Sequence, residues 1–177
     1  MMGERNNLIL REIENADAEK LSNLIQQVEA SSQYMLWEAG EREIENESQK
    51  KMIERMEDSN NSTILVAENK NNELVGYLFA IGGDAKRNKH SAYIVVGISE
   101  NYRGQGVGSK LFKELEQWAT QHGIRRLELT VVTGNQAGLS LYKNMGFEVE
   151  GVKRYSLFIN DEFVDEYYMS KIISPIY

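Results

Sequence analysis

The chain has 177 residues, of which 41% are hydrophobic and 27% charged, which is typical of one globular domain spanning residues 1–177. Its formal net charge of −7 argues against a nucleic-acid partner, because phosphates would repel an acidic surface. No apolar run is long enough to cross a membrane, and the absence of cysteine excludes disulfides and a cysteine nucleophile. Given two histidines and a polar N-terminus without a signal-peptide core, we expect a cytoplasmic protein with no metal centre.

The first half of the chain predicts a strand, two helices and a pair of antiparallel strands. Residues 8–13 form the predicted first strand, and Asn15 or Asp17 is expected to cap a helix with apolar residues at helical spacing over 21–28. A second helix is predicted over 47–57. Strands over 63–68 and 74–81 flank a turn-rich segment, which favours a hairpin.

The middle of the chain is an apolar strand that ends in a glycine-rich turn. The strand over 94–98 is followed by Gly104, Gly106 and Gly108, which tolerate positive φ and leave no Cβ between the backbone and a ligand. Apolar residues at helical spacing follow up to Gly123, a predicted helix stop. Backbone N–H groups at such a helix start bind anions, so the turn predicts a phosphate site. The alternative is that the glycines only shape a tight surface turn.

Two other phosphate-binding patterns fit this turn poorly. A Walker loop needs Gly-Lys-Ser/Thr, whereas Gly108-Ser109-Lys110 has the reverse order. A dinucleotide-binding turn needs Gly-x-Gly-x-x-Gly, whereas the glycines here alternate strictly.

The last third predicts a strand over 127–132, a short helix from Asn135 and a closing hairpin. The hairpin strands are expected over 147–158 and 163–171, around the turn Asn160-Asp161. The order of elements predicts a mixed α/β fold in which one βα unit interrupts an otherwise antiparallel sheet.

The glycine turn and the segment after the strand over 127–132 together resemble the GNAT superfamily of acyl-CoA-dependent N-acetyltransferases. That family has a turn Arg/Gln-x-x-Gly-x-Gly/Ala, and later an Asn, a Leu-Tyr pair and a Gly-Phe pair. The matching positions are Arg103, Gly106, Gly108, Asn135, Leu141, Tyr142, Gly146 and Phe147. One departure is Gly138, where relatives usually carry Ala. The resemblance covers roughly residues 8–171.

The resemblance implies the GNAT fold, an α/β fold whose mostly antiparallel sheet of about seven strands contains a βα pyrophosphate-binding unit, flanked by about four helices. It implies acetyl-CoA as cofactor and a set of residues that bind it: Gly97, Ile98, Arg103, Gly104, Gln105, Gly106, Val107, Gly108, Ser109 and Asn135. In this fold the strand before the turn bulges and splays from its neighbour, so that pantetheine enters beside Gly97. The alternative for Gly97 is that it relieves crowding in a packed sheet.

Acetyl transfer to an amine needs a base for the ammonium proton and an acid for the leaving thiolate. Tyr142 is the candidate acid, because its phenol is neutral at working pH and the family geometry directs it at the sulfur. Glu100 is the candidate base, and Glu128 and His90 are alternatives. Asn135 also fits a helix N-cap.

The acceptor is expected to be a small-molecule amine or a peptide amine. In this fold the segment between the first two helices covers the acceptor end, and here it contains Tyr34, Trp37 and several glutamates. These residues suit an amine with an apolar or cationic body, or they seal the core. A protein N-terminal or lysine acetyltransferase, a non-catalytic acyl-CoA-binding module and a different acyl donor such as succinyl-CoA remain alternatives. The edge of the closing hairpin predicts a homodimer.

Overall fold

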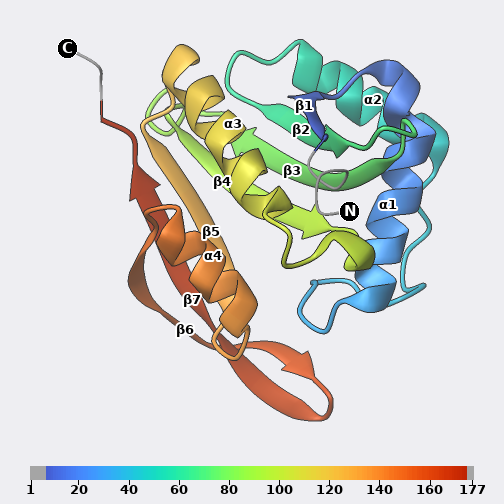
Figure 1. Cartoon of the computed structure of the whole chain (residues 1–177). Helices are drawn as coiled ribbons and strands as arrows, with labels where there is room; N and C mark the ends of the chain where they lie inside the picture. The colour runs from blue at the N-terminus through green and yellow to red at the C-terminus, as the bar shows by residue number, and fades with distance from the viewer. Residues whose placement is uncertain (1–6, 175–177) are drawn as a thin grey trace.

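The computed structural model describes residues 7–174, which form one twisted sheet with helices on both faces (Figure 1). The seven strands of this part of the chain are β1 (Ile9–Glu12), β2 (Thr63–Glu68), β3 (Leu74–Gly82), β4 (Ser91–Ile98), β5 (Arg126–Val132), β6 (Glu148–Ile159) and β7 (Glu162–Ile172). Its four α-helices are α1 (Ala18–Ser31), α2 (Asn46–Glu57), α3 (Val107–Gln121) and α4 (Gln136–Asn144). The predicted mixed α/β architecture is confirmed.

The strands lie in the order β1-β2-β3-β4-β5-β7-β6. All neighbouring strands are antiparallel except β4 and β5, which run parallel because α3 crosses between them. This is the predicted βα unit within an antiparallel sheet. The closing hairpin turns at Asn160 and Asp161, whose φ values of 51° and 63° fit a tight hairpin turn.

Each face of the sheet has its own hydrophobic core. On one face, α3 packs Leu111 and Leu115 against the sheet, and both side chains are fully buried. On the other face, α1 and α2 contribute Leu21 and Ile53, which are equally buried. Strand β2, which lies between β1 and β3, is buried along its whole length because its alternate side chains enter the two cores.

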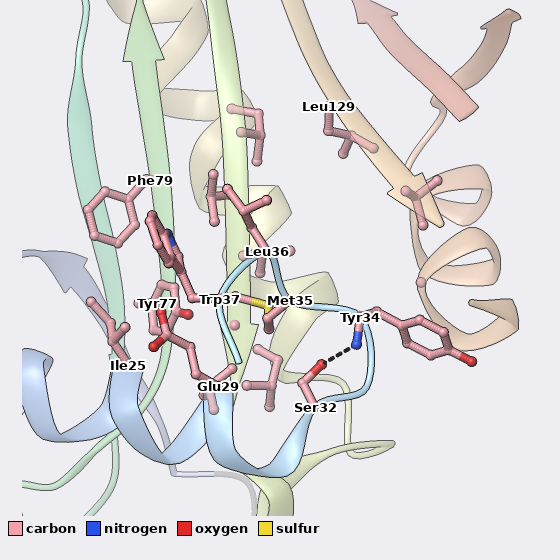
Figure 2. A pocket seen from close by; sticks show the side chains of 18 of the residues that line it. Ile25, Glu29, Ser32, Tyr34, Met35, Leu36, Trp37, Tyr77, Phe79 and Leu129 are labelled. Carbon is pink, nitrogen blue, oxygen red and sulfur yellow. Dashed lines mark hydrogen bonds between the residues drawn. The ribbon is translucent and has the colours of Figure 1, made fainter. Parts of the chain in front are cut away.

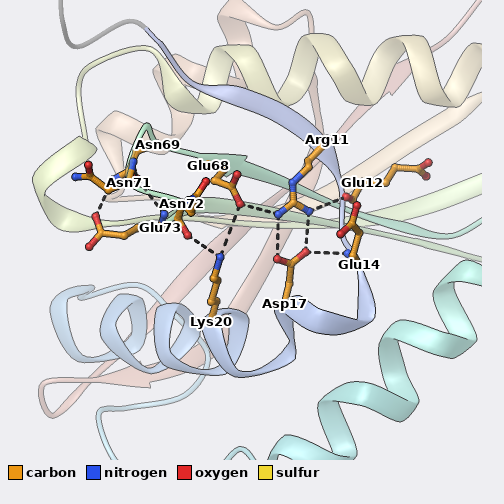
Figure 3. Close-up of polar contacts among 10 residues, drawn as sticks. All are labelled: Arg11, Glu12, Glu14, Asp17, Lys20, Glu68, Asn69, Asn71, Asn72 and Glu73. Atoms are coloured by element: carbon orange, nitrogen blue, oxygen red, sulfur yellow. Dashed lines mark hydrogen bonds and ion pairs between the residues drawn. The ribbon is translucent and has the colours of Figure 1, made fainter.

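Asp17 stands at the predicted N-cap position of α1, but its side chain makes no cap hydrogen bond to that helix. Asn15 and Asp17 belong to a short 3₁₀ turn, η1 (Asn15–Asp17), and neither caps α1 through its side chain. Asp17 instead accepts hydrogen bonds from Arg11 at 2.7 and 2.9 Å and from the Glu14 N–H at 2.8 Å. Arg11 also donates to Glu68 at 2.7 Å, so one guanidinium joins β1, β2 and the start of α1 (Figure 3).

Among residues 7–174, none of the helices is both long enough and apolar enough to cross a lipid bilayer.

Candidate active site

A large cavity lies where β4 and β5 separate. The two strands pair only between Ser91–Tyr93 and Arg126–Glu128, and beyond these residues they diverge. The cavity has a volume of about 1450 Å³ and is lined by β3, β4, β5, the end of α1, the start of α3, residues of α2, α4 and the closing hairpin, and the loop over residues 32–45. The predicted splaying of the strand before the glycine turn is therefore confirmed.

The glycine turn forms one end of this cavity and exposes the start of α3. Gly104 and Gly106 have φ values of 71° and 83°, and a Cβ at either position would meet no atom within 4 Å. Among residues 7–174, no side chain caps the first turn of α3, whose N–H groups have no partner within the helix. Gly108 acts differently, because a Cβ there would lie 2.8 Å from Leu141 Cδ2 on α4. The turn thus offers an open, positively polarised backbone that fits a pyrophosphate.

Arg103 lies at the same end of the cavity and is held by hydrogen bonds within the protein. Its guanidinium donates to the Ile98 carbonyl at 3.1 Å, and to the carbonyl and hydroxyl oxygens of Ser31 at 3.2 and 2.8 Å. It therefore connects the ends of β4 and α1 while it lines the cavity. Gln105 donates to the Asn101 carbonyl at 2.8 Å. That Arg103 and Gln105 bind the cofactor remains a prediction.

Gly97 pairs regularly with β3, so the predicted bulge is absent. The register runs without a shift from Gly76↔Ile98 to Gly82↔Ala92. A Cβ on Gly97 would lie only 2.5 Å from the Tyr77 hydroxyl oxygen, because the Tyr77 ring crosses over this strand position. The glycine relieves this crowding, and it also brings a tyrosine hydroxyl to the cavity edge of β4.

Helix α4 carries Asn135 and Tyr142 into the opposite wall. Asn135 is the N-cap, since its side-chain oxygen accepts from the Gly138 N–H at 3.0 Å, and this predicted role is confirmed. Tyr142 packs edge-on against Phe112, with ring centroids 5.7 Å apart. Burial, with a smaller contribution from Tyr93, raises the pKa of Tyr142 to about 12. Tyr142 therefore keeps its proton at neutral pH and presents an O–H donor to the cavity.

None of the three candidate bases lies in the lining of the cavity. Glu100 is exposed in the 3₁₀ turn η2 (Glu100–Tyr102), and His90 is exposed before β4. Glu128 accepts a hydrogen bond from Arg126 at 2.8 Å. The catalytic role of Glu100 thus remains a prediction to which the cavity geometry adds no support.

Among the buried polar residues of the lining, Glu29 on α1 and Tyr77 on β3 were not predicted from the sequence. They are 4% and 1% exposed, and both lie in the wall formed by α1 and the loop over 32–45 (Figure 2). The sequence did contain a signal for Glu29, because it follows Leu21 and Ile25 at intervals of four on the apolar side of its helix. A carboxylate at such a position is expected to be paired or functional.

Known proteins share both the sequence pattern and the fold. The acetyltransferase (GNAT) family profile matches residues 29–147. The L-amino acid N-acetyltransferase AaaT of Escherichia coli is 33% identical over 105 residues, which are 56% of this chain and 62% of that protein, somewhat less than two thirds of its length.

Two solved structures superpose over nearly the whole chain. A GNAT-family acetyltransferase from Streptococcus pneumoniae has a TM-score of 0.90 at 30% identity, and the match covers 95% of this chain and all of the other. The yncA acetyltransferase of Salmonella typhimurium, solved with its cofactor acetyl-CoA, has a TM-score of 0.84 at 18% identity, with 96% and 95% covered. The last comparison shows the fold alone. With the family profile matching two thirds of its residues, the chain belongs to the acetyltransferase (GNAT) family, whose enzymes use acetyl-CoA.

Proposed function

We propose that the protein transfers an acetyl group from acetyl-CoA to a primary amine of a small-molecule acceptor, by direct attack within a ternary complex. The observation that carries this proposal is the cavity between β4 and β5, which joins an open helix start to a protonated tyrosine. The similarity to an L-amino acid N-acetyltransferase supports a small-molecule acceptor. Direct attack follows because the chain has no cysteine to carry an acetyl group.

The residues divide between binding and proton transfer. The first-turn N–H groups of α3, from Val107 to Ser109, would hold the pyrophosphate, together with Arg103. On its β5 side, β4 beyond Tyr93 pairs with no strand of the described part of the chain, which leaves backbone groups near Gly97 and Ile98 for the pantetheine. When bound, acetyl-CoA supplies a thioester that is activated toward amines. Tyr142 would donate its hydroxyl proton, or a hydrogen bond, to the sulfur that leaves.

The proposal is tested by thiol release from acetyl-CoA with a panel of amines, amino acids, polyamines and peptide N-termini. Replacing Tyr142 by Phe removes one hydroxyl and keeps the ring against Phe112. We expect the turnover number to fall by about 100-fold or more, within the usual contribution of a general acid. The dissociation constant for CoA, measured by calorimetry, should not change.

Other outcomes of the same panel decide between the alternatives. Activity confined to peptides would identify a protein N-terminal or lysine acetyltransferase. Tight CoA binding without turnover on any amine would indicate an acyl-CoA-binding module, and turnover with succinyl-CoA alone would identify another acyl donor. The homodimer expected from the hairpin edge is checked by light scattering at micromolar concentration, where a monomer alone would contradict it.

A further inference from the structure

The cavity wall formed by α1 contains Glu29, a carboxylate in which only one of the two oxygens accepts hydrogen bonds from the described part of the chain. Arg42, from the loop over 32–45, donates its Nε and Nη2 groups to the same oxygen of Glu29, Oε1, at 3.0 and 2.5 Å. No residue within 7–174 donates a hydrogen bond to the other oxygen, Oε2. Glu29 lines the cavity and is the one buried carboxylate among its described lining residues. An accepting oxygen is therefore available on a charged side chain that is almost completely buried.

The hydroxyl of Tyr77 is a second oxygen in the same situation. Tyr77 is 1% exposed and also lines the cavity, and its hydroxyl makes no hydrogen bond to the described part of the chain. Every fully enclosed side-chain nitrogen or oxygen atom of the described residues has a hydrogen-bond partner. The two unpartnered oxygens are therefore open to the cavity. Burial raises the pKa of the Tyr77 phenol, the charge of Glu29 adds to this rise, and the charges of Arg42 and Arg103 oppose it.

An apolar surface surrounds these two oxygens, with the positive charges of Arg42 and Arg103 nearby. Ile25, Phe79 and Met35 give the wall an apolar surface, on which a charge-assisted hydrogen bond is stronger than in water (Figure 2). Arg42 does not donate to Oε2, because both of its hydrogen bonds to Glu29 go to Oε1, and its guanidinium carbon lies 5.2 Å from the centre of the Trp37 ring. A primary ammonium group has three donors and can satisfy Oε2 and the Tyr77 hydroxyl together.

The position of this pair separates it from the proposed chemistry. Tyr142 lies on α4, across the opening between β4 and β5, whereas Glu29 lies on α1 beneath the loop over 32–45. An amine held by Glu29 and an amine directed toward Tyr142 therefore occupy different walls of one cavity. We propose that Glu29 and Tyr77 bind a second ammonium group of the acceptor, so that the enzyme prefers diamines and similarly dicationic amines over monoamines; this inference rests on the acetyl transfer proposed above.

Putrescine and butylamine test this proposal, because they share a carbon chain and differ by one amino group. Binding to the CoA-saturated protein is measured by calorimetry, and acetylation by thiol release. We expect the wild type to favour putrescine by about 10- to 100-fold in both measurements, the range of a hydrogen bond to a charged group. Glu29→Gln keeps an acceptor for Arg42 but loses the charge, and should reduce this preference to nearly one.

Two further variants control for charge and for folding. Glu19→Gln removes one negative charge from an exposed residue of α1 that is not part of the cavity lining, and should keep the preference for putrescine. Tyr77→Phe keeps the ring over Gly97 and should lower the preference by about threefold to tenfold. If Glu29→Gln does not fold, the amine preference of Tyr77→Phe alone tests the proposal.

Equal binding of the two amines by the wild type, or an unchanged preference in both Glu29→Gln and Tyr77→Phe, would overturn the inference. If butylamine is still acetylated in that case, acetyl transfer stands and only the role of Glu29 and Tyr77 is lost. If no amine is acetylated, the proposed function fails, and the binding titrations still decide whether this wall takes an ammonium group.

Discussion

The sequence predicts the structural roles of some cavity residues and not of others. Asn135 is a predictable cap, because capping depends on a hydrogen bond to a backbone group three positions away. The structural role of Gly97 cannot be predicted from the sequence in the same way. Two explanations for it were open, and the choice depends on Tyr77, which lies on another strand and is brought over the glycine by the β3–β4 register. Glu29 has the same difficulty, since its partner Arg42 lies on an irregular loop.

The Asp17 carboxylate is expected to stabilise the folded protein. Burial acts to raise its pKa, but hydrogen bonds from Arg11 and the Glu14 N–H outweigh it, and the folded-state pKa lies below 3.8. The folded protein is therefore stabilised by this carboxylate above pH 3.8, and the contribution is lost as pH falls through the lower, folded-state pKa. We expect Asp17→Asn to reduce the free energy of unfolding by about 1–3 kcal/mol at neutral pH, measured in urea.

Measuring the free energy of unfolding at several pH values distinguishes the Arg11–Asp17 pair from an ion pair on an exposed surface. In strongly acidic buffer the wild type and Asp17→Asn should converge, because Asp17 is then protonated. Glu150→Gln is the matched control, since Glu150 also accepts hydrogen bonds from an arginine, Arg126, but on an exposed strand. Its effect on stability should be undetectable. An equal loss in both variants at neutral pH would contradict the importance of burial for Asp17.

The positions of the helices and strands are predicted from the sequence more accurately than any other feature of the molecule. The strand over 63–68 was predicted with the bounds of β2, and the helix over 47–57 differs from α2 by one residue. This agreement arises because hydrophobic periodicity is local and is preserved when the chain folds. The loop over 32–45 has no such period, so the ion pair between its Arg42 and Glu29 on α1 could not be predicted.

The two ends of α3 allow a matched test of the proposed phosphate site. Gly106 before the helix and Gly123 after it have φ values of 83° and 71°, and a Cβ on either would meet no atom within 4 Å. Alanine at either position should therefore cost a similar amount of stability, about 1–2 kcal/mol. Only Gly106 lines the cavity, so only Gly106→Ala should weaken CoA binding, by about tenfold or more.

Thermal unfolding and calorimetric titration of the two variants measure these effects side by side. A comparable loss of CoA affinity in Gly123→Ala would mean that helix stability, rather than the open backbone at Gly106, controls binding. Unchanged affinity in Gly106→Ala would remove the glycine turn from the proposed phosphate site.

At the scale of the whole molecule, the cavity arises from the sheet topology. A parallel pair, β4 and β5, lies within an otherwise antiparallel sheet, and the strands part after three residue pairs. The sequence predicts the parallel βα unit and the closing hairpin. It does not predict that β7 lies between β5 and β6, because strand order depends on contacts between distant segments. The resemblance to GNAT enzymes supplied the opening between the strands, which periodicity alone does not indicate.

Identification of the reaction product by mass spectrometry decides whether this molecule acetylates amines. After incubation with acetyl-CoA and an amine that releases thiol, mass spectrometry of the amine should show one added acetyl group for each thiol formed. The yield should depend on active protein and fall in Tyr142→Phe. Thiol release without an acetylated amine would indicate hydrolysis of the thioester instead, and would contradict the account given for this cavity.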